Sequence, residues 1–172
     1  KYIGGEGAIS NHVSNFTKNI KLLGMIGDKN NYKKFIQQNL NKNIKTDFFI
    51  KKDSPTILKK RFLDSVTLNK MLGVYEIEDS ALSNLQEKKL RKKILSLLPK
   101  FDVVIVSDYG HGFISSKNSN LINMHSSFLA LNAQVNAANI GHHSLKKYKN
   151  IDAVIINENE LKHEMRDKNT DI

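Results

Sequence analysis

Short apolar runs recur in the second half of the chain, and each is followed by a helical pattern of polar and apolar positions. The runs cover residues 103–106 (VVIV), 128–131 (FLAL) and 153–156 (AVII). Consecutive apolar residues bounded by polar ones are typical of a strand buried on both faces. Strands that alternate with helices indicate right-handed crossovers and a parallel sheet. We therefore expect an α/β fold with a Rossmann-like, three-layer, mostly parallel sheet.

The strongest helical pattern comes before these runs. It covers residues 78–98, where leucine and isoleucine form an apolar stripe, and Asp79 or Ser80 can cap it. Pro99 ends the pattern because it cannot continue a helix. The positive charge gathered at 88–93 is interpreted as a solvated face.

Residues 51–78 show a different pattern, in which charged and apolar residues are mixed. Residues 51–55 predict a turn, and residues 56–63 and 68–77 predict two strands around a second turn. The mixture favours a β ribbon with one wet face, outside the main sheet. Such a ribbon can cover a binding cleft as a lid; a plain edge hairpin is only slightly less favoured. Lys59 and Arg61 share one face of the ribbon, where Arg61 could hold a carboxylate or phosphate bidentately.

The composition indicates one globular domain of 172 residues, with 40% hydrophobic and 26% charged residues. The absence of cysteine excludes disulfides and thiolate metal sites, which suits a reducing, cytoplasmic setting. No apolar run approaches the ~20 residues of a membrane span, so we expect no membrane partner. The net charge of +10 comes mostly from dispersed lysines, and abundant Lys, Asn and Ile are typical of AT-rich coding sequences. The charge therefore gives weak support to a nucleic-acid partner, although part of it could serve anionic ligands.

Polar side chains gather directly after the run at 103–106. Asp108, Tyr109 and His111 alternate with the permissive residues Gly110 and Gly112. Ligands of open α/β sheets bind just beyond the carboxyl ends of the strands, so Asp108 is a candidate substrate-binding residue. An Asp at this place could instead be the N-cap of the next helix, within a tight turn. The residues alone support the two interpretations about equally.

Two helix entries carry further candidate chemistry. Gly4 and Gly5 precede a helical pattern, where glycines let a ligand approach the backbone and the free N–H groups; a flexible loop is the alternative. Asn157 and Glu160 follow the run at 153–156 and lie on one face of a helix. They could organise hydrated Mg²⁺ and phosphate. The same spacing is that of a capping box, and spacing alone favours the cap.

Four features in this order resemble the ribokinase-like (PfkB) carbohydrate kinase family. They are GGEG at 4–7 before a helix, the strand–helix–ribbon order, SDYGHG at 107–112, and Asn157-x-x-Glu160 after AVII. The resemblance is closest to the heptose-phosphate kinase-like branch, which is often fused to a nucleotidyltransferase. In that branch an SDYG-type motif follows the central strand, and a PTxxKxR-like ribbon segment matches residues 55–61. The resemblance covers nearly the whole chain.

The resemblance implies phosphoryl transfer from ATP, with Mg²⁺, to a hydroxyl of a sugar or sugar phosphate. It also implies one partial ribokinase-like domain over residues 1–172, with the lid at 51–78 and a homodimer contact through that lid. The residues that it places at the substrate and at the phosphates come from both halves of the chain. The substrate set is Gly4, Gly5, Asn11, Lys59, Arg61 and Asp108, and the nucleotide-phosphate set is Asn157 and Glu160, with Glu160 also at the metal.

Four departures from the family pattern limit this prediction. The chain begins almost on the paired glycines and ends soon after Glu160, so the family's Gly-Ala-Gly-Asp anion hole has no counterpart. The catalytic base is therefore expected beyond Ile172, and residues 1–172 alone are expected to be inactive. Asn11 stands only near the family's usual Asn, and His111 replaces a Lys of the heptose branch. The alternative is a non-catalytic sugar- or nucleotide-binding, or regulatory, module on the same fold.

Overall fold

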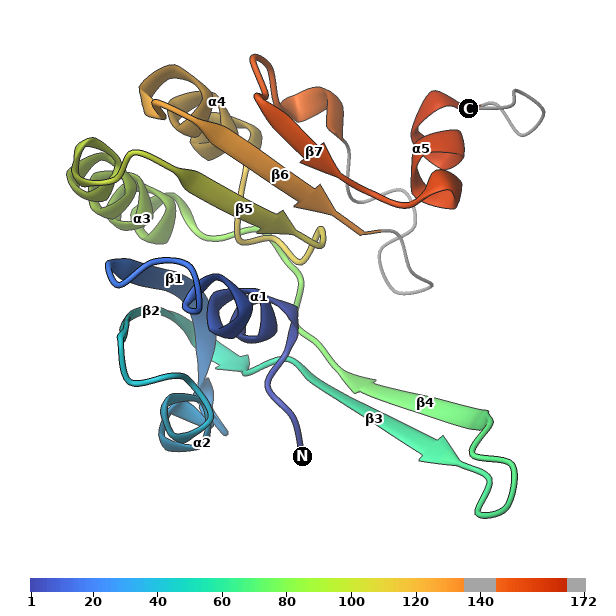
Figure 1. The fold of residues 1–172 in the computed structure, drawn as a ribbon. Helices are drawn as coiled ribbons and strands as arrows, with labels where there is room; N and C mark the ends of the chain where they lie inside the picture. Colours follow the sequence, from blue (N-terminus) through green and yellow to red (C-terminus); the bar gives the residue numbers. More distant parts are fainter. Residues whose placement is uncertain (135–144, 167–172) are drawn as a thin grey trace. The chain divides into compact units, whose positions relative to one another are not determined.

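A computed structural model describes residues 1–134 and 145–166, which alternate between strands and helices (Figure 1). The strands are β1 (Ile20–Lys29), β2 (Ile44–Pro55), β3 (Leu58–Leu63), β4 (Lys70–Glu76), β5 (Val104–Asp108), β6 (Leu129–Ala133) and β7 (Ala153–Ile155). The α-helices are α1 (Gly5–Val13), α2 (Lys33–Gln38), α3 (Asn84–Leu97), α4 (Ser116–His125) and α5 (Glu158–Met165), and the 3₁₀ helices are η1 (Leu98–Lys100) and η2 (Leu145–Lys147). This alternation, with parallel strands, confirms the predicted α/β class.

The chain folds as two compact units, Lys1–Glu78 and Asp79–Ile172. The first unit contains a parallel pair, β1–β2, and an antiparallel ribbon, β3–β4; the second contains a parallel sheet in the order β5–β6–β7. The boundary falls where the predicted lid segment ends. The assignment of residues 1–172 to one partial domain stays a prediction.

In the first unit, β1 and β2 pair in parallel, from Ile20 opposite Ile44 to Gly27 opposite Lys51. The prediction of a turn at 51–55 is wrong, because β2 continues to Pro55. The extension is held by the carboxylate of Asp28, which accepts the backbone N–H groups of Asp53 and Ser54 at 2.9 and 3.1 Å. The acceptors for these N–H groups thus come from a side chain of β1, and the local sequence of residues 51–55 gives no sign of them.

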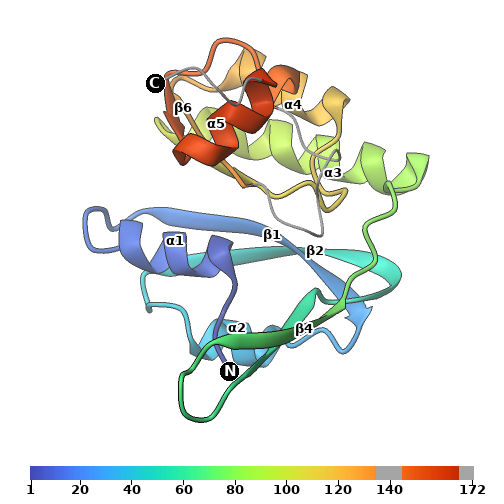
Figure 2. The ribbon, with the colours of Figure 1, turned by 90° about the vertical axis from the view of Figure 1, so that its right-hand side faces the viewer.

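The ribbon predicted after β2 is present as β3 and β4, which pair antiparallel around a turn (Figures 1 and 2). Asp64 organises that turn: its Oδ1 accepts the backbone N–H groups of Val66 and Thr67. The ribbon extends away from the β1–β2 pair and leaves large apolar side chains exposed, among them Phe62 and Leu72. Its role as a lid stays a prediction.

In the second unit, the core lies around β6 and the helices α3 and α4, which contact each other (Figure 2). Leu90, Leu129 and Leu131 are fully buried. α3 begins at Asn84 rather than at residue 78, and neither Asp79 nor Ser80 is its cap. The actual cap is Ser83, which forms a reciprocal capping box with Gln86.

The prediction that the strands are buried on both faces is only half correct. Val106 lies beside Leu131 on a buried face, whereas Ile105, on the opposite face, is 41% exposed. In β7, Ile155 is 60% exposed. Alternate side chains of one strand therefore meet different surroundings. Within the described ranges, no helix has the length and apolar character needed to cross a bilayer.

Candidate functional site

The carboxyl ends of β5, β6 and β7 meet at one edge of their sheet. The register places Asp108 beside Ala133 and Asn132 beside Ile155. The side chains continue this connection: Nδ2 of Asn132 donates to the carbonyl oxygen of Ile155 at 2.8 Å, and the hydroxyl of Tyr109 donates to Oδ1 of Asn132 at 3.3 Å. The residues that follow the parallel strands are thus neighbours within the second unit.

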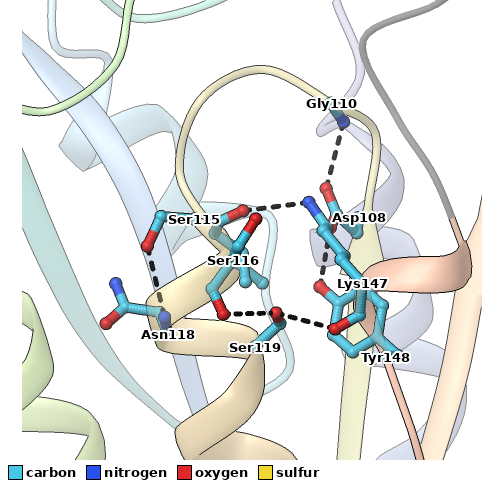
Figure 3. A network of polar contacts seen from close by, with 9 residues as sticks. Asp108, Gly110, Ser115, Ser116, Asn118, Ser119, Lys147 and Tyr148 are labelled. Carbon is cyan, nitrogen blue, oxygen red and sulfur yellow. Dashed lines mark hydrogen bonds and ion pairs between the residues drawn. The ribbon is translucent and has the colours of Figure 1, made fainter.

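Asp108, the last residue of β5, has a buried carboxylate that meets three donors (Figure 3). Its Oδ1 accepts the backbone N–H of Gly110 at 3.1 Å. Its Oδ2 accepts the hydroxyl of Tyr148 at 2.6 Å and lies 2.5 Å from Nζ of Lys147. Such pairing offsets the cost of taking the carboxylate out of water. The alternative that Asp108 caps the next helix is wrong, because that N-cap is Ser115.

The surroundings of Tyr148, whose hydroxyl donates a hydrogen bond to Asp108, oppose ionisation of the phenol. Burial is the main cause, and the negative charge and hydrogen bond of Asp108 add to it; together they raise the pKa of the Tyr148 phenol far above its usual range. The phenol therefore stays protonated at neutral pH. The charge of Asp108 is matched by the ammonium of Lys147.

The loop at 109–114 forms one wall of a small depression in the second unit. Gly110 and Gly112 have φ angles of 70° and 77°, which glycine adopts without strain. A Cβ on Gly112 would lie 2.7 Å from the carbonyl oxygen of Asp79 and 2.8 Å from that of Ser80, so this close approach requires glycine. The polar groups around the depression include carboxylates that accept and an ammonium that donates, a combination suited to hydroxyl groups. They belong to Asp79, Glu87, Gly110, Gly112, Ser115 and Lys147.

Asn157 and Glu160 form the capping box of α5. Oδ1 of Asn157 accepts the N–H of Glu160, and Oε2 of Glu160 accepts the N–H of Asn157, both at 2.9 Å. In the part of the chain that the structure describes, no group of three or more His, Cys, Asp or Glu residues could hold a metal ion. Glu160 therefore fits Mg²⁺ only where phosphates and water supply most of the ligands, as Mg²⁺ sites commonly do. Its role in metal binding stays a prediction.

The N-terminal candidates surround the start of α1. Gly4 is the N-cap and Gly5 the first helical residue, and the space where a Cβ of Gly4 would lie is open. The side chain of Asn11 is engaged elsewhere: Nδ2 donates to the carbonyl oxygen of Asn39 at 2.8 Å, and Oδ1 accepts the N–H of Asn41 at 2.9 Å. Asn11 thus fixes the segment after α2, and a contact between Asn11 and a substrate stays a prediction.

Lys59 and Arg61 lie on one face of β3, opposite Tyr75 and Gly73 of β4. Nζ of Lys59 and Nζ of Lys70 each lie 5.8 Å from the ring centroid of Tyr75. Partial burial lowers the pKa of the Lys59 ammonium, and the nearby charge of Arg61 adds to this effect, whereas Tyr75 opposes it. This face of the ribbon therefore concentrates positive charge around one aromatic ring and could receive an anionic group.

Comparisons with known proteins support the same fold. Over 113 residues the chain is 29% identical to the bifunctional protein HldE of Blochmanniella pennsylvanica, a match that covers 65% of this chain and 23% of HldE. A crystal structure of a possible 1-phosphofructokinase from Thermotoga maritima is similar, with a TM-score of 0.59 and 14% identity, over 76% of this chain and 42% of that one. The chain has the ribokinase-like fold. No family model matches it.

These matches confirm the resemblance to the ribokinase-like (PfkB) carbohydrate kinases and to their heptose-phosphate kinase-like branch. The chain spans less than half the length of either protein. The activity of a whole ribokinase-like kinase, its substrates and its partners are therefore proposals for this chain.

The predicted site residues fall into two groups. Gly4, Gly5, Asn11, Lys59 and Arg61 belong to the first unit, and Asp108, Asn157 and Glu160 belong to the second. Within the second unit, the parallel register brings the ends of β5 and β7 to the same edge of the ribokinase-like sheet, as predicted. The assembly of both groups into one pocket stays a prediction.

Lys147 and Tyr148, which hold Asp108, were not predicted from the sequence. The Tyr148–Asp108 hydrogen bond joins positions 40 residues apart, and neither Lys147 nor Tyr148 belongs to a motif named in the sequence. The feature of the sequence that could have indicated them was Asp108 itself, a carboxylate at the end of a predicted strand. A buried acid needs a compensating donor, and the segment between β6 and β7 is the next one to return to this edge of the sheet.

Proposed function

We propose that the chain is part of an ATP-dependent kinase of the PfkB type, which phosphorylates a hydroxyl group of a sugar or sugar phosphate. The observation that carries this proposal is the match to HldE over 113 residues, in a chain with the ribokinase-like fold. The name of the Thermotoga relative, a possible 1-phosphofructokinase, supports a phosphorylated sugar as one class of acceptor.

Phosphoryl transfer depends mainly on positioning and on stabilisation of negative charge. We assign the sugar to the open backbone at Gly4 and Gly5, with Asn11 beside them. Lys59 and Arg61 would hold an anionic group of the substrate, because they share the cationic face of the ribbon. Asn157 and Glu160 would orient the phosphates of ATP and hydrated Mg²⁺ at the start of α5. When bound, Mg²⁺ supplies charge neutralisation between the phosphates.

We also propose that the ribbon contributes to a homodimer. Phe62, Leu72 and Val74 lie, with Lys60, on the face of the ribbon opposite to Lys59 and Arg61, and the three apolar residues are 53%, 56% and 47% exposed. A second copy that covers this apolar face would leave the cationic face accessible. Sedimentation velocity tests this arrangement: Phe62→Ser should shift a dimer toward monomer, whereas a monomeric wild type refutes it.

The alternative function is a binding or regulatory module without catalysis. The carboxylate of Asp108 already meets three donors and is buried, so it is poorly placed to act as a base; this fits the alternative and equally a kinase whose base lies beyond Ile172. A kinase binds both the sugar and the nucleotide, whereas a binding or regulatory module needs to bind only one of them.

The experiment that tests the proposal combines binding with turnover on residues 1–172. Calorimetry would measure the binding of MgATP and of a panel of sugars and sugar phosphates, and a coupled assay would follow ADP release. We expect a sugar or sugar phosphate to bind, with weaker binding in Lys59→Met and Arg61→Met if the ligand is anionic. Binding without turnover is the result expected of residues 1–172 under both functions, and a Gly-Ala-Gly-Asp stretch beyond Ile172 would then favour the kinase; robust turnover would show that the catalytic base lies within residues 1–172. Failure of every ligand to bind refutes both functions.

A further inference from the structure

We propose that Lys147 is a positioning residue: it holds the loop at 109–114 in the conformation that forms one wall of the depression after β5. Nζ of Lys147 lies 2.5 Å from Oδ2 of Asp108, the residue before the loop. The same Nζ donates to the carbonyl oxygen of Ile114, the last residue of the loop, at 2.9 Å. One ammonium group therefore joins the two ends of a six-residue segment.

The segment that carries Lys147 is itself fixed to α4. The hydroxyl of Ser119 lies 3.0 Å from the carbonyl oxygens of both Ser116 and Lys147, and the Ser119 side chain is fully buried (Figure 3). On the other side, Tyr148 is buried and donates to Asp108. The backbone at Lys147 is thus held by α4 and by β5, so its side chain starts from a fixed position and can restrain the loop.

The chemistry of the contact requires a cation of this length. Asp108 is a buried acceptor, and the carbonyl oxygen of Ile114 is another, so the group between them must donate twice and carry positive charge. A methionine has similar volume but no donor, and it would leave Asp108 beside the hydroxyl of Tyr148 alone on Oδ2. An arginine keeps the charge and offers donors in a different geometry. The loop contains Gly110 and Gly112, which lack side-chain restraints of their own, so this bridge adds to the hydrogen bonds of Gly110 and Tyr109 in fixing its shape.

The role at a substrate rests on the proposed function and on the prediction that Asp108, which Lys147 holds, contacts the sugar, because the depression would then border the sugar. Lys147 lines that depression together with Gly110, Gly112 and Ser115. A loop released from Lys147 would sample many conformations, and a bound sugar would have to restore one of them. The expected consequence is weaker binding of the sugar.

Hydrogen–deuterium exchange tests the structural part without any ligand. In Lys147→Met, the amides of residues 109–115 should exchange at least ~10-fold faster, whereas those of β6 and α4 keep their protection. Lys149→Met is the matched control, since it removes the same charge from an exposed position two residues away. Lys147→Arg should restore part of the protection. If Lys147→Met does not fold, Asp108→Asn combined with Lys147→Met removes the buried charge and still lacks the bridge to Ile114.

Two outcomes overturn the proposal. The first is that the amides of residues 109–115 exchange no faster in Lys147→Met than in the control Lys149→Met. If Lys147→Met does not fold, the double variant is compared with the control in the same way. The second is that these amides exchange faster in Lys147→Met but the affinity for the sugar is unchanged. Calorimetry measures this affinity with the sugar or sugar phosphate that the wild type binds. We expect the affinity of Lys147→Met to fall by about 10-fold or more and to recover partly in Lys147→Arg. If the wild type binds no sugar, the proposed function fails, and the exchange data still decide the role of Lys147 in the loop.

Discussion

Tyr148 donates a hydrogen bond of 2.6 Å to Asp108 from a position 40 residues later in the chain. Both side chains are nearly excluded from solvent. This contact links the end of β5 to the segment before β7, across β6. Parallel strands cannot be joined by tight turns, so contacts of this kind between the connecting segments stabilise their strand ends.

Replacement of Tyr148 by Phe should destabilise the protein without a large change in packing volume. The substitution removes one hydrogen bond to a buried carboxylate, a loss of about 1.5–3 kcal/mol in the free energy of unfolding. Urea denaturation of wild type and variant measures this difference. Lys149→Met, at an exposed position, serves as the control and should be nearly neutral. A difference below ~0.5 kcal/mol for Tyr148→Phe would contradict the importance of the contact.

The same residue should make stability depend on pH in the alkaline range. The pKa of Tyr148 lies above its usual value of 10.0 in the folded protein, because of burial and of the charge of Asp108. Above about pH 10 the unfolded chain releases this proton and the folded chain keeps it, so the contribution of Tyr148 to stability falls as the pH rises. Below pH ~10 that contribution is fully present. Tyr148→Phe should therefore show a shallower decline above pH 10; parallel curves would refute the shift.

Much of the second unit could be predicted because its strands are short apolar runs. Residues 103–106 and 128–131 lie within or beside β5 and β6 for that reason. The first unit was harder. Residues 51–55 have the composition of a turn, yet pairing with β1 and the carboxylate of Asp28, 25 residues before Asp53, make them part of β2. Local composition carries no information about such a distant acceptor.

Some features of the candidate site could likewise be predicted from the sequence, and others could not. The position of Asp108 at the end of a parallel strand follows from periodicity and topology, and the capping box at Asn157 and Glu160 follows from spacing. The partners of Asp108 do not, since Lys147 and Tyr148 occupy a segment without regular periodicity. Their contact with Asp108 depends on how the chain crosses from β6 to β7, which is a property of the tertiary structure.

Asp28 should make the stability of the protein depend on pH in the acid range. Its hydrogen bonds from the backbone, first from Asp53 and then from Ser54, lower its pKa below the usual 3.8. Near pH 4 the unfolded state thus binds more protons, so the stabilisation is present above about pH 4 and is lost as the pH falls through the folded pKa. Asp28→Asn should flatten the acid limb of a plot of stability against pH. Asp102→Asn is an exposed control, and equal acid limbs in the two variants would refute the role of Asp28.

Gly27 should tolerate no side chain. A Cβ at this position would lie 2.0 Å from the carbonyl oxygen of Ser54 and 2.3 Å from the carbonyl carbon of Pro55. These are backbone atoms of β2, which cannot yield as a flexible side chain does, so Gly27→Ala should cost about 3 kcal/mol. Gly4→Ala is the comparison, since nothing lies within 4 Å of its Cβ. Thermal unfolding of the two variants measures the contrast, and similar midpoints would contradict it.

Substitutions at Asn157 should separate capping from phosphate binding. Asp caps helices about as well as Asn, so Asn157→Asp should keep the stability of α5, whereas Asn157→Ala should lose about 1 kcal/mol. If Asn157 also contacts the phosphates of ATP, the added negative charge of Asn157→Asp should weaken MgATP binding by roughly 10-fold, an effect of ~1.4 kcal/mol. Ser83→Ala removes the cap of α3 and should lower stability without changing MgATP affinity. Calorimetry and urea denaturation give both quantities, and an Asn157→Asp variant with wild-type affinity would restrict Asn157 to its cap.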